Sequence, residues 1–265
     1  MNPFLRIMRP SVCMMSLLGI LVGSIVAGVA SPLLILLAIV AAILITGAGN
    51  VVNDYFDVET DRVNAPHRPI PAGKVSLKGA LWFFAVLNII GVVLAVFVSW
   101  EFLGIALFNV LVSFVYAWKL KKAPFVGNVA VSYLGASAFL AAGLIEGLPG
   151  LPIITLALIA FFGTISREIF KDIRDVAGDK KIGAKTLPLI WGLGKSRGLA
   201  IAFLAIGCIL LALPVPMFSL FYLVGAVPAA ALCIFAATRK PARAEKLVKI
   251  AIFLVLLGFI LGSIF

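Results

Sequence analysis

Long apolar stretches, each close to twenty residues, constrain the fold of this chain more than any other feature. A helix of roughly 20 mostly apolar residues crosses a bilayer core about 30 Å thick. Nine stretches of this kind are present, at residues 11–30, 33–53, 77–99, 102–118, 126–145, 151–171, 196–213, 217–237 and 247–264. Of the 265 residues, 63% are apolar and 12% are charged, which excludes a soluble globule and a disordered chain. The sequence therefore predicts an all-α membrane protein with nine transmembrane helices in a single domain over residues 1–265.

The positions of the basic residues support this count. When the nine spans alternate in direction, all 22 Lys and Arg residues fall on one side of the membrane, and only Glu101 and Glu146 fall on the other. Because basic loops remain in the cytoplasm, we expect the N-terminus and the large loops to be cytoplasmic and the C-terminus to lie outside the cell membrane. The net charge of +11 then reflects topology and attraction to lipid, not nucleic-acid binding.

Two short acidic runs repeat one spacing at a constant offset of 118 residues. The first lies at the end of the second span and the second at the end of the sixth, and their aspartates are Asp54, Asp57 and Asp61, and Asp172, Asp175 and Asp179. Spacings of three and four predict that each trio shares one helix face. Since the second and sixth spans run in the same direction, we expect two parallel four-helix halves, about 1–122 and 123–240, followed by a ninth helix at 246–265.

The acidic runs favour a hard divalent cation. Three carboxylates on one helix face repel each other near a membrane unless cations neutralise them. Mg²⁺ binds oxygen ligands and typically takes one or two carboxylates together with substrate phosphates. A zinc or iron site is disfavoured, because the only histidine, His67, has no second ligand nearby. Lys and Arg residues around the runs indicate a Mg²⁺-bound polyanion, and Arg68, Lys119 and Lys171 flank the runs or a span end.

The residues of both runs resemble the UbiA-type intramembrane prenyltransferase superfamily. The first run is Asn53, Asp54, Asp57 and Asp61, followed by Arg62-Val63-Asn64 and Arg68-Pro69-Ile70-Pro71. The second is Asp172, Asp175 and Asp179, followed by Gly183 and Lys185-Thr186-Leu187-Pro188. Both patterns are similar to those of the family, and they lie at matching span ends.

The resemblance implies a fold, a reaction and a set of site residues. The implied fold is that of the UbiA-type prenyltransferases, and the implied cofactor is Mg²⁺. The metal ligands would be Asn53, Asp54, Asp57, Asp61, Asp172, Asp175 and Asp179, and the six aspartates would be catalytic. The residues that would bind substrate diphosphate or phosphate are Asn53, Arg62, Arg68, Lys119, Lys122, Arg167 and Lys171. The implied partners are an isoprenyl diphosphate donor, a lipid or aromatic acceptor and membrane lipid, with no nucleic acid and no obligate protein partner.

Within the superfamily, residues 166–172 and 126–128 resemble archaeal members that act on lipids. Those members transfer a geranylgeranyl group from geranylgeranyl diphosphate to geranylgeranylglyceryl phosphate, which forms the second ether bond of archaeal membrane lipids. The alternative is an aromatic prenyltransferase of quinone biosynthesis that acts on 4-hydroxybenzoate or a naphthoate. A cation-coupled transporter is less favoured, because the carboxylates lie at span ends and not at the membrane midplane.

Overall fold

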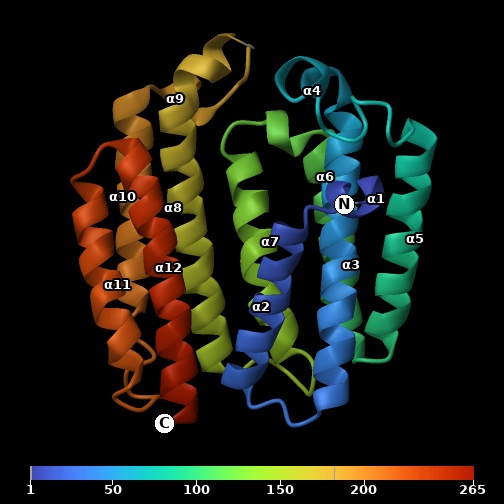
Figure 1. Ribbon diagram of the computed structural model, residues 1–265. Helices are drawn as coiled ribbons and strands as arrows, with labels where there is room; N and C mark the ends of the chain where they lie inside the picture. The colour runs from blue at the N-terminus through green and yellow to red at the C-terminus, as the bar shows by residue number, and fades with distance from the viewer. Residues whose placement is uncertain (1, 182) are drawn as a thin grey trace. The chain divides into compact units, whose positions relative to one another are not determined.

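The computed structural model describes residues 2–181 and 183–265. For Lys122 and Lys181 it describes only the backbone. These described residues form helices and no strand (Figure 1). The helices are α1 (Pro3–Ile7), α2 (Pro10–Ala27), α3 (Pro32–Phe56), α4 (Val58–Asn64), α5 (Leu77–Val96), α6 (Trp100–Trp118), the 3₁₀ turn η1 (Leu120–Lys122), α7 (Val126–Gly143), α8 (Leu151–Lys181), α9 (Leu187–Trp191), α10 (Leu193–Leu210), α11 (Tyr222–Ala237) and α12 (Pro241–Ile264).

Each predicted span coincides with one helix. Eight helices of the described chain are long and apolar enough to cross a membrane: α2, α3, α5, α6, α7, α8, α10 and α12. The remaining predicted span, 217–237, contains α11, which is apolar but has only 16 residues. The protein is therefore a multi-pass membrane protein.

The chain divides into two compact units. The first consists of Met1–Ser24, Val29–Lys119 and Ala141–Leu148, and in it α3 packs against α5 and α6. The second consists of Ile25–Gly28, Leu120–Leu140 and Pro149–Phe265, and in it α8 packs against α10 and α12, while α12 also packs against α11. Each unit contains one of the two acidic runs.

The first acidic run corrects one prediction, because its aspartates do not share an uninterrupted helix. Helix α3 ends at Phe56 and α4 begins at Val58, so Asp57 lies at the junction with φ −91° and ψ 0°. Helical hydrogen bonds continue on both sides, from the Asp57 N–H to the Asn53 carbonyl and from the Asp61 N–H to the Asp57 carbonyl. Asp57 is thus at the N-cap position of α4, although its side chain makes no capping hydrogen bond. The second trio does lie on one helix, α8.

Glu146 has a structural contact within the first unit. Its carboxylate oxygens accept the backbone N–H groups of Ala30 and Ser31, both at 2.9 Å. Ser31 caps the N-terminus of α3 by accepting the N–H of Leu34. A carboxylate at a helix N-terminus is stabilised by the unpaired N–H groups and the helix dipole, so Glu146 fixes the end of α3 that is distant from the acidic run.

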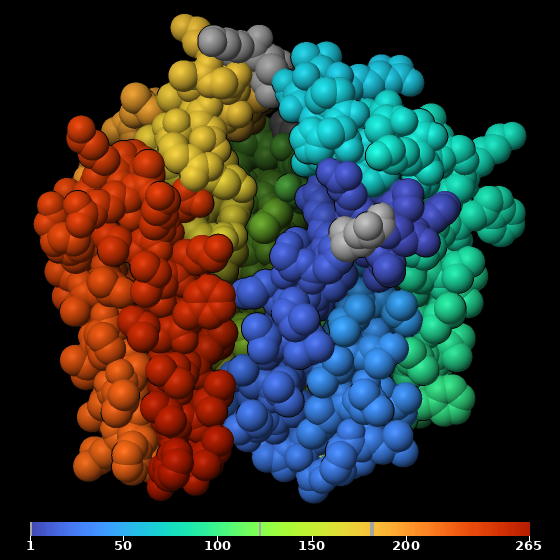
Figure 2. Space-filling view, viewed as in Figure 1, coloured from blue at the N-terminus to red at the C-terminus, as the bar shows by residue number. Residues whose placement is uncertain are grey.

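Two glycines allow α11 and α12 to approach closely in the second unit. A Cβ atom at Gly225 would lie 2.1 Å from the Leu254 carbonyl oxygen and 2.5 Å from the Gly258 nitrogen. The side chains of these two helices, orange and red in the space-filling view, lie in continuous contact (Figure 2). Small residues at helix interfaces permit this kind of backbone approach in membranes.

We expect Gly225→Ala to destabilise the protein by about 1–3 kcal/mol, because the new methyl group forces α11 and α12 apart. Gly198→Ala on α10 is the matched control, since a Cβ atom there meets nothing within 4 Å. The control gains the higher helix propensity of Ala, about 1 kcal/mol, without a clash. Thermal unfolding in detergent measures both variants, and equal unfolding temperatures would contradict the close approach.

Candidate active site

The N-terminal segment is fastened to α3 beside the first acidic run. The Asn50 side-chain amide donates to the Met8 carbonyl at 2.8 Å, and a Cβ atom at Gly47 would lie 2.6 Å from the Met8 methyl carbon. Ile7 is fully buried. Arg9 follows in the left-handed region with φ 54°, which is unfavourable for a residue with a Cβ atom. The packing around Met8 therefore holds Arg9 in a strained conformation.

Arg9 donates to the buried carboxylate of Asp54, and Arg68 forms an ion pair with it. The Arg9 Nη2 lies 2.5 Å from Asp54 Oδ1, and the Asp54 side chain is only 4% exposed. The Arg68 Nη1 lies 3.6 Å from the same oxygen and 2.6 Å from Asp61 Oδ2. The Nη1 of Arg68 thus lies between the carboxylates of Asp54 on α3 and Asp61 on α4. This pair of carboxylates can therefore hold a cation.

The environment of Arg68 keeps its guanidinium charged. Burial alone would lower the pKa of Arg68, but the hydrogen bond to Asp61 and the charges of Asp54, Asp61 and Asp57 raise it above its ordinary value. The carboxylates of Asp54 and Asp61 are in turn stabilised by charged donors, Arg9 and Arg68. The Asp57 carboxylate is oriented by the Asn53 amide, which donates to its Oδ2 at 3.1 Å.

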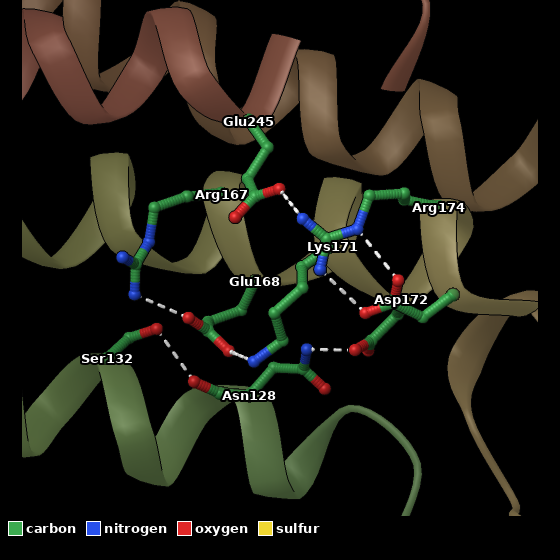
Figure 3. Close-up of polar contacts among 9 residues, drawn as sticks. Asn128, Ser132, Arg167, Glu168, Lys171, Asp172, Arg174 and Glu245 are labelled. Atoms are coloured by element: carbon green, nitrogen blue, oxygen red, sulfur yellow. Dashed lines mark hydrogen bonds and ion pairs between the residues drawn. The ribbon is translucent and has the colours of Figure 1, made fainter. Parts of the chain in front are cut away.

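In the second unit, α7 supplies a partner for the first aspartate of the second run. The Asn128 amide donates to Asp172 Oδ2 at 2.9 Å (Figure 3). The turn before α7 fixes this position, because Phe125 has a left-handed φ of 64° and a Cβ atom at Gly127 would lie 2.8 Å from the Leu120 carbonyl oxygen. The sequence pattern indicates only a helix start at Asn128 and does not predict this contact.

Arg174 connects the second run to α12. Its Nε and Nη2 each donate to one carboxylate oxygen of Asp175 at 2.7 Å, and its Nη1 donates to Glu245 (Figure 3). This fork geometry is the strong form of an arginine–carboxylate pair. Neither Arg174 nor Glu245 was predicted as a site residue. In the sequence, nothing distinguishes them from the many other charged residues near the ends of the apolar stretches.

Arg167 and Lys171 share the carboxylate of Glu168. The Arg167 Nη2 donates to Glu168 Oε1 at 2.5 Å, and the Lys171 ammonium donates to Oε2. The Glu168 side chain is 8% exposed, against 29% for Arg167 and 42% for Lys171. In Figure 3 the Glu168 and Lys171 side chains extend from α8 toward α7, where Asn128 lies.

The other predicted phosphate-binding residues have different surroundings. Arg62 forms an exposed pair with Glu59, at 2.9 and 3.0 Å from its two oxygens. The Lys119 ammonium lies 3.9 Å from the centre of the Trp118 ring, which is a cation–π distance. The side chain of Lys122 lies outside the described part of the chain. Phosphate binding by these three residues stays a prediction.

Among residues 2–181 and 183–265, no group of three or more His, Cys, Asp and Glu residues is placed to hold a metal ion. Mg²⁺ usually completes its coordination with water and substrate phosphates and needs only one or two carboxylates. The Asp54 and Asp61 oxygens, which converge on one guanidinium nitrogen, satisfy that smaller requirement. The oxygen donors present therefore fit Mg²⁺, and the assignment of all seven predicted ligands stays a prediction.

Comparison with known proteins gives full-length matches. The digeranylgeranylglyceryl phosphate synthase of Methanopyrus kandleri is 38% identical to this chain, and the match covers 98% of each protein. The synthase of Methanococcoides burtonii is 41% identical, and the match covers 99% of this chain and 100% of that synthase. A solved structure concerned with a digeranylgeranylglyceryl phosphate synthase in membranes has 34% identity and a TM-score of 0.90, with 99% of this chain and 98% of that chain covered.

A more distant solved structure shares the fold. It is a UbiA homologue from Archaeoglobus fulgidus bound to GPP and Mg²⁺, with a TM-score of 0.75 and 20% identity over 99% of this chain and all of the other. The sequence profile of the UbiA prenyltransferase family matches residues 16–260. The chain belongs to the UbiA prenyltransferase family.

Proposed function

We propose that this protein transfers a geranylgeranyl group from geranylgeranyl diphosphate to geranylgeranylglyceryl phosphate. The observation that carries the proposal is the full-length similarity to digeranylgeranylglyceryl phosphate synthases at 38–41% identity. In the reaction, the allylic carbon–oxygen bond of the donor breaks and its electron pair leaves with the diphosphate. The acceptor hydroxyl oxygen forms the new ether bond, and its proton is taken up by the departing diphosphate.

The charged residues of the two runs suit the departure of a diphosphate. Mg²⁺, when bound through Asn53 and the aspartates, supplies positive charge that stabilises the leaving group. Arg68, held by Asp54 and Asp61, presents a fixed guanidinium next to that carboxylate pair. Preorganised charges of this kind stabilise developing negative charge without reorganisation during the reaction. Apolar helices around such a site would limit the access of water to the allylic cation.

We also propose the finer topology. The chain would cross the membrane nine times, with α11 as the eighth crossing and with two parallel four-helix halves followed by α12. Support comes from the basic residues, which all fall on one side for this count. The N-terminus and both acidic runs would be cytoplasmic.

Prenyl transfer by the purified protein in lipid tests the function. Radiolabelled geranylgeranyl diphosphate and Mg²⁺ are supplied with either geranylgeranylglyceryl phosphate or 4-hydroxybenzoate. We expect labelled ether lipid with the first acceptor only, and no product when EDTA replaces Mg²⁺. Product with the benzoate only would keep the reaction class and refute the proposed acceptor.

A further inference from the structure

The start of the second acidic run lies at the end of the apolar part of α8. Glu146 and Arg167 are separated by 20 residues without Asp, Glu, Lys or Arg, and most of these residues belong to α8. Sixteen of them, residues 151–166, are helical and span about 24 Å, most of the thickness of a hydrocarbon core. Arg167 is therefore the first charged residue at the end of the apolar part of α8. Asp172 and Asp179 lie about 8 and 18 Å farther along the helix.

Arg167 retains an unused donor at this depth. Its Nη2 donates to Glu168, but its Nε is buried and has no hydrogen-bond partner among the described residues. A buried donor without an acceptor is destabilising, and more so when it is charged. A second anion beside Arg167 would satisfy this group.

The local arrangement of charges points to the same kind of ligand. Arg167 and Lys171 carry two positive charges against the single negative charge of Glu168. Glu168 is nearly buried, so the two cations are held in place by a carboxylate that water screens poorly. The Asp172 carboxylate next to Lys171 balances the one excess positive charge of the cluster of Arg167, Glu168 and Lys171. The fixed cationic donors and the unpartnered Nε of Arg167 are therefore what favours an anion here.

We propose that this cluster binds the phosphate of the lipid acceptor, and that the aspartates of the two runs act on the diphosphate of the donor. The inference rests on the proposed function, in which the acceptor carries a phosphate that does not react. A lipid acceptor presents its phosphate at the end of the hydrocarbon region, and Arg167 is the first charged residue after the apolar part of α8. Arg167 and Lys171 then select phosphorylated acceptors, and Glu168 positions both cations.

The test compares Arg167→Gln with wild type on two acceptors, geranylgeranylglyceryl phosphate and geranylgeranylglycerol, which lacks the phosphate. We expect kcat/KM for the phosphorylated acceptor to fall about 30-fold, as for loss of a hydrogen bond to a charged group. The value for geranylgeranylglycerol and the KM for geranylgeranyl diphosphate should change less than about threefold. Lys171→Gln should likewise lower kcat/KM only for the phosphorylated acceptor. Arg167→Lys should recover only part of the activity lost in Arg167→Gln, because Lys lacks the planar guanidinium.

Lys195→Gln is the control for loss of a positive charge, since Lys195 is exposed on α10. A direct binding measurement makes the test independent of turnover: equilibrium binding of geranylgeranylglyceryl phosphate without donor or Mg²⁺ should weaken in Arg167→Gln and not in Lys195→Gln. Equal losses with both acceptors, or a rise only in the KM for the donor, would overturn the inference. A wild-type protein that binds geranylgeranylglyceryl phosphate through Arg167 but does not prenylate it would refute the proposed function alone.

Discussion

Asp57→Asn and Asp175→Asn are each expected to reduce prenyl transfer by about 10³-fold, with little change in folding. Asn has the shape of Asp but lacks the negative charge that a divalent cation requires, and loss of one preorganised electrostatic contact costs about 10²–10³ in rate. Both aspartates are only partly buried, and each has a neighbouring donor, Asn53 or Arg174, that can also bond to an amide oxygen. The measurement is kcat for geranylgeranyl transfer at saturating substrates, together with the thermal unfolding temperature.

Glu59→Gln is the matched control for the first run. Glu59 lies two residues from Asp57 and Asp61, carries the same charge and forms an exposed pair with Arg62. Exposed pairs contribute about 0–1 kcal/mol, so the control should retain activity within about twofold. Full activity in both aspartate variants would exclude a role for these carboxylates in the reaction. Equal losses in Glu59→Gln would indicate a general effect of charge at this end of the helices.

The sequence predicted the helices well because the membrane imposes a length and a composition on each of them. Eight of the nine apolar stretches overlap helices long enough to cross a membrane, and the stretch at 217–237 contains the shorter helix α11. The break at Asp57 was not predicted. Spacings of three and four are compatible both with one helix and with two helices that meet at a capping residue, and the pattern does not distinguish them.

The partners of the site residues were less predictable than the residues themselves. Arg9 is 45 positions from Asp54, and Asn128 is 44 positions from Asp172. In the sequence, Arg9 is one of many basic residues near a span end, and Asn128 lies near the start of a helix. Only packing around Met8 and the turn at Phe125 brings their side chains to the aspartates. Arg9 and Phe125 adopt left-handed backbones that their residue types do not indicate, so the sequence carried no signal that could have selected these partners.

Arg68→Gln is expected to lower the free energy of unfolding by about 3 kcal/mol, near the lower end for removal of one partner from a buried ion pair. The substitution removes the donor that lies 2.6 Å from the Asp61 carboxylate, whose side chain is only 8% exposed. The loss is at the lower end because the Arg68 side chain is 34% exposed and because Arg9 remains beside Asp54. Arg62→Gln is the control, because it breaks only the exposed pair with Glu59. Surface changes of that kind remain within about 0.5 kcal/mol. Thermal and chemical unfolding in detergent measure both variants.

Mg²⁺ should reverse part of this loss if Asp54 and Asp61 form a cation site. In wild type, the Arg68 guanidinium lies between these carboxylates and competes with a metal ion. In Arg68→Gln the same oxygens lack that cation, so we expect Mg²⁺ to raise the unfolding temperature of the variant more than that of wild type. A ligand at 100 times its Kd stabilises the folded state by about 2.7 kcal/mol, which would nearly offset the substitution. An Arg68→Gln protein that is destabilised but unaffected by Mg²⁺ would show that these two carboxylates do not bind the metal.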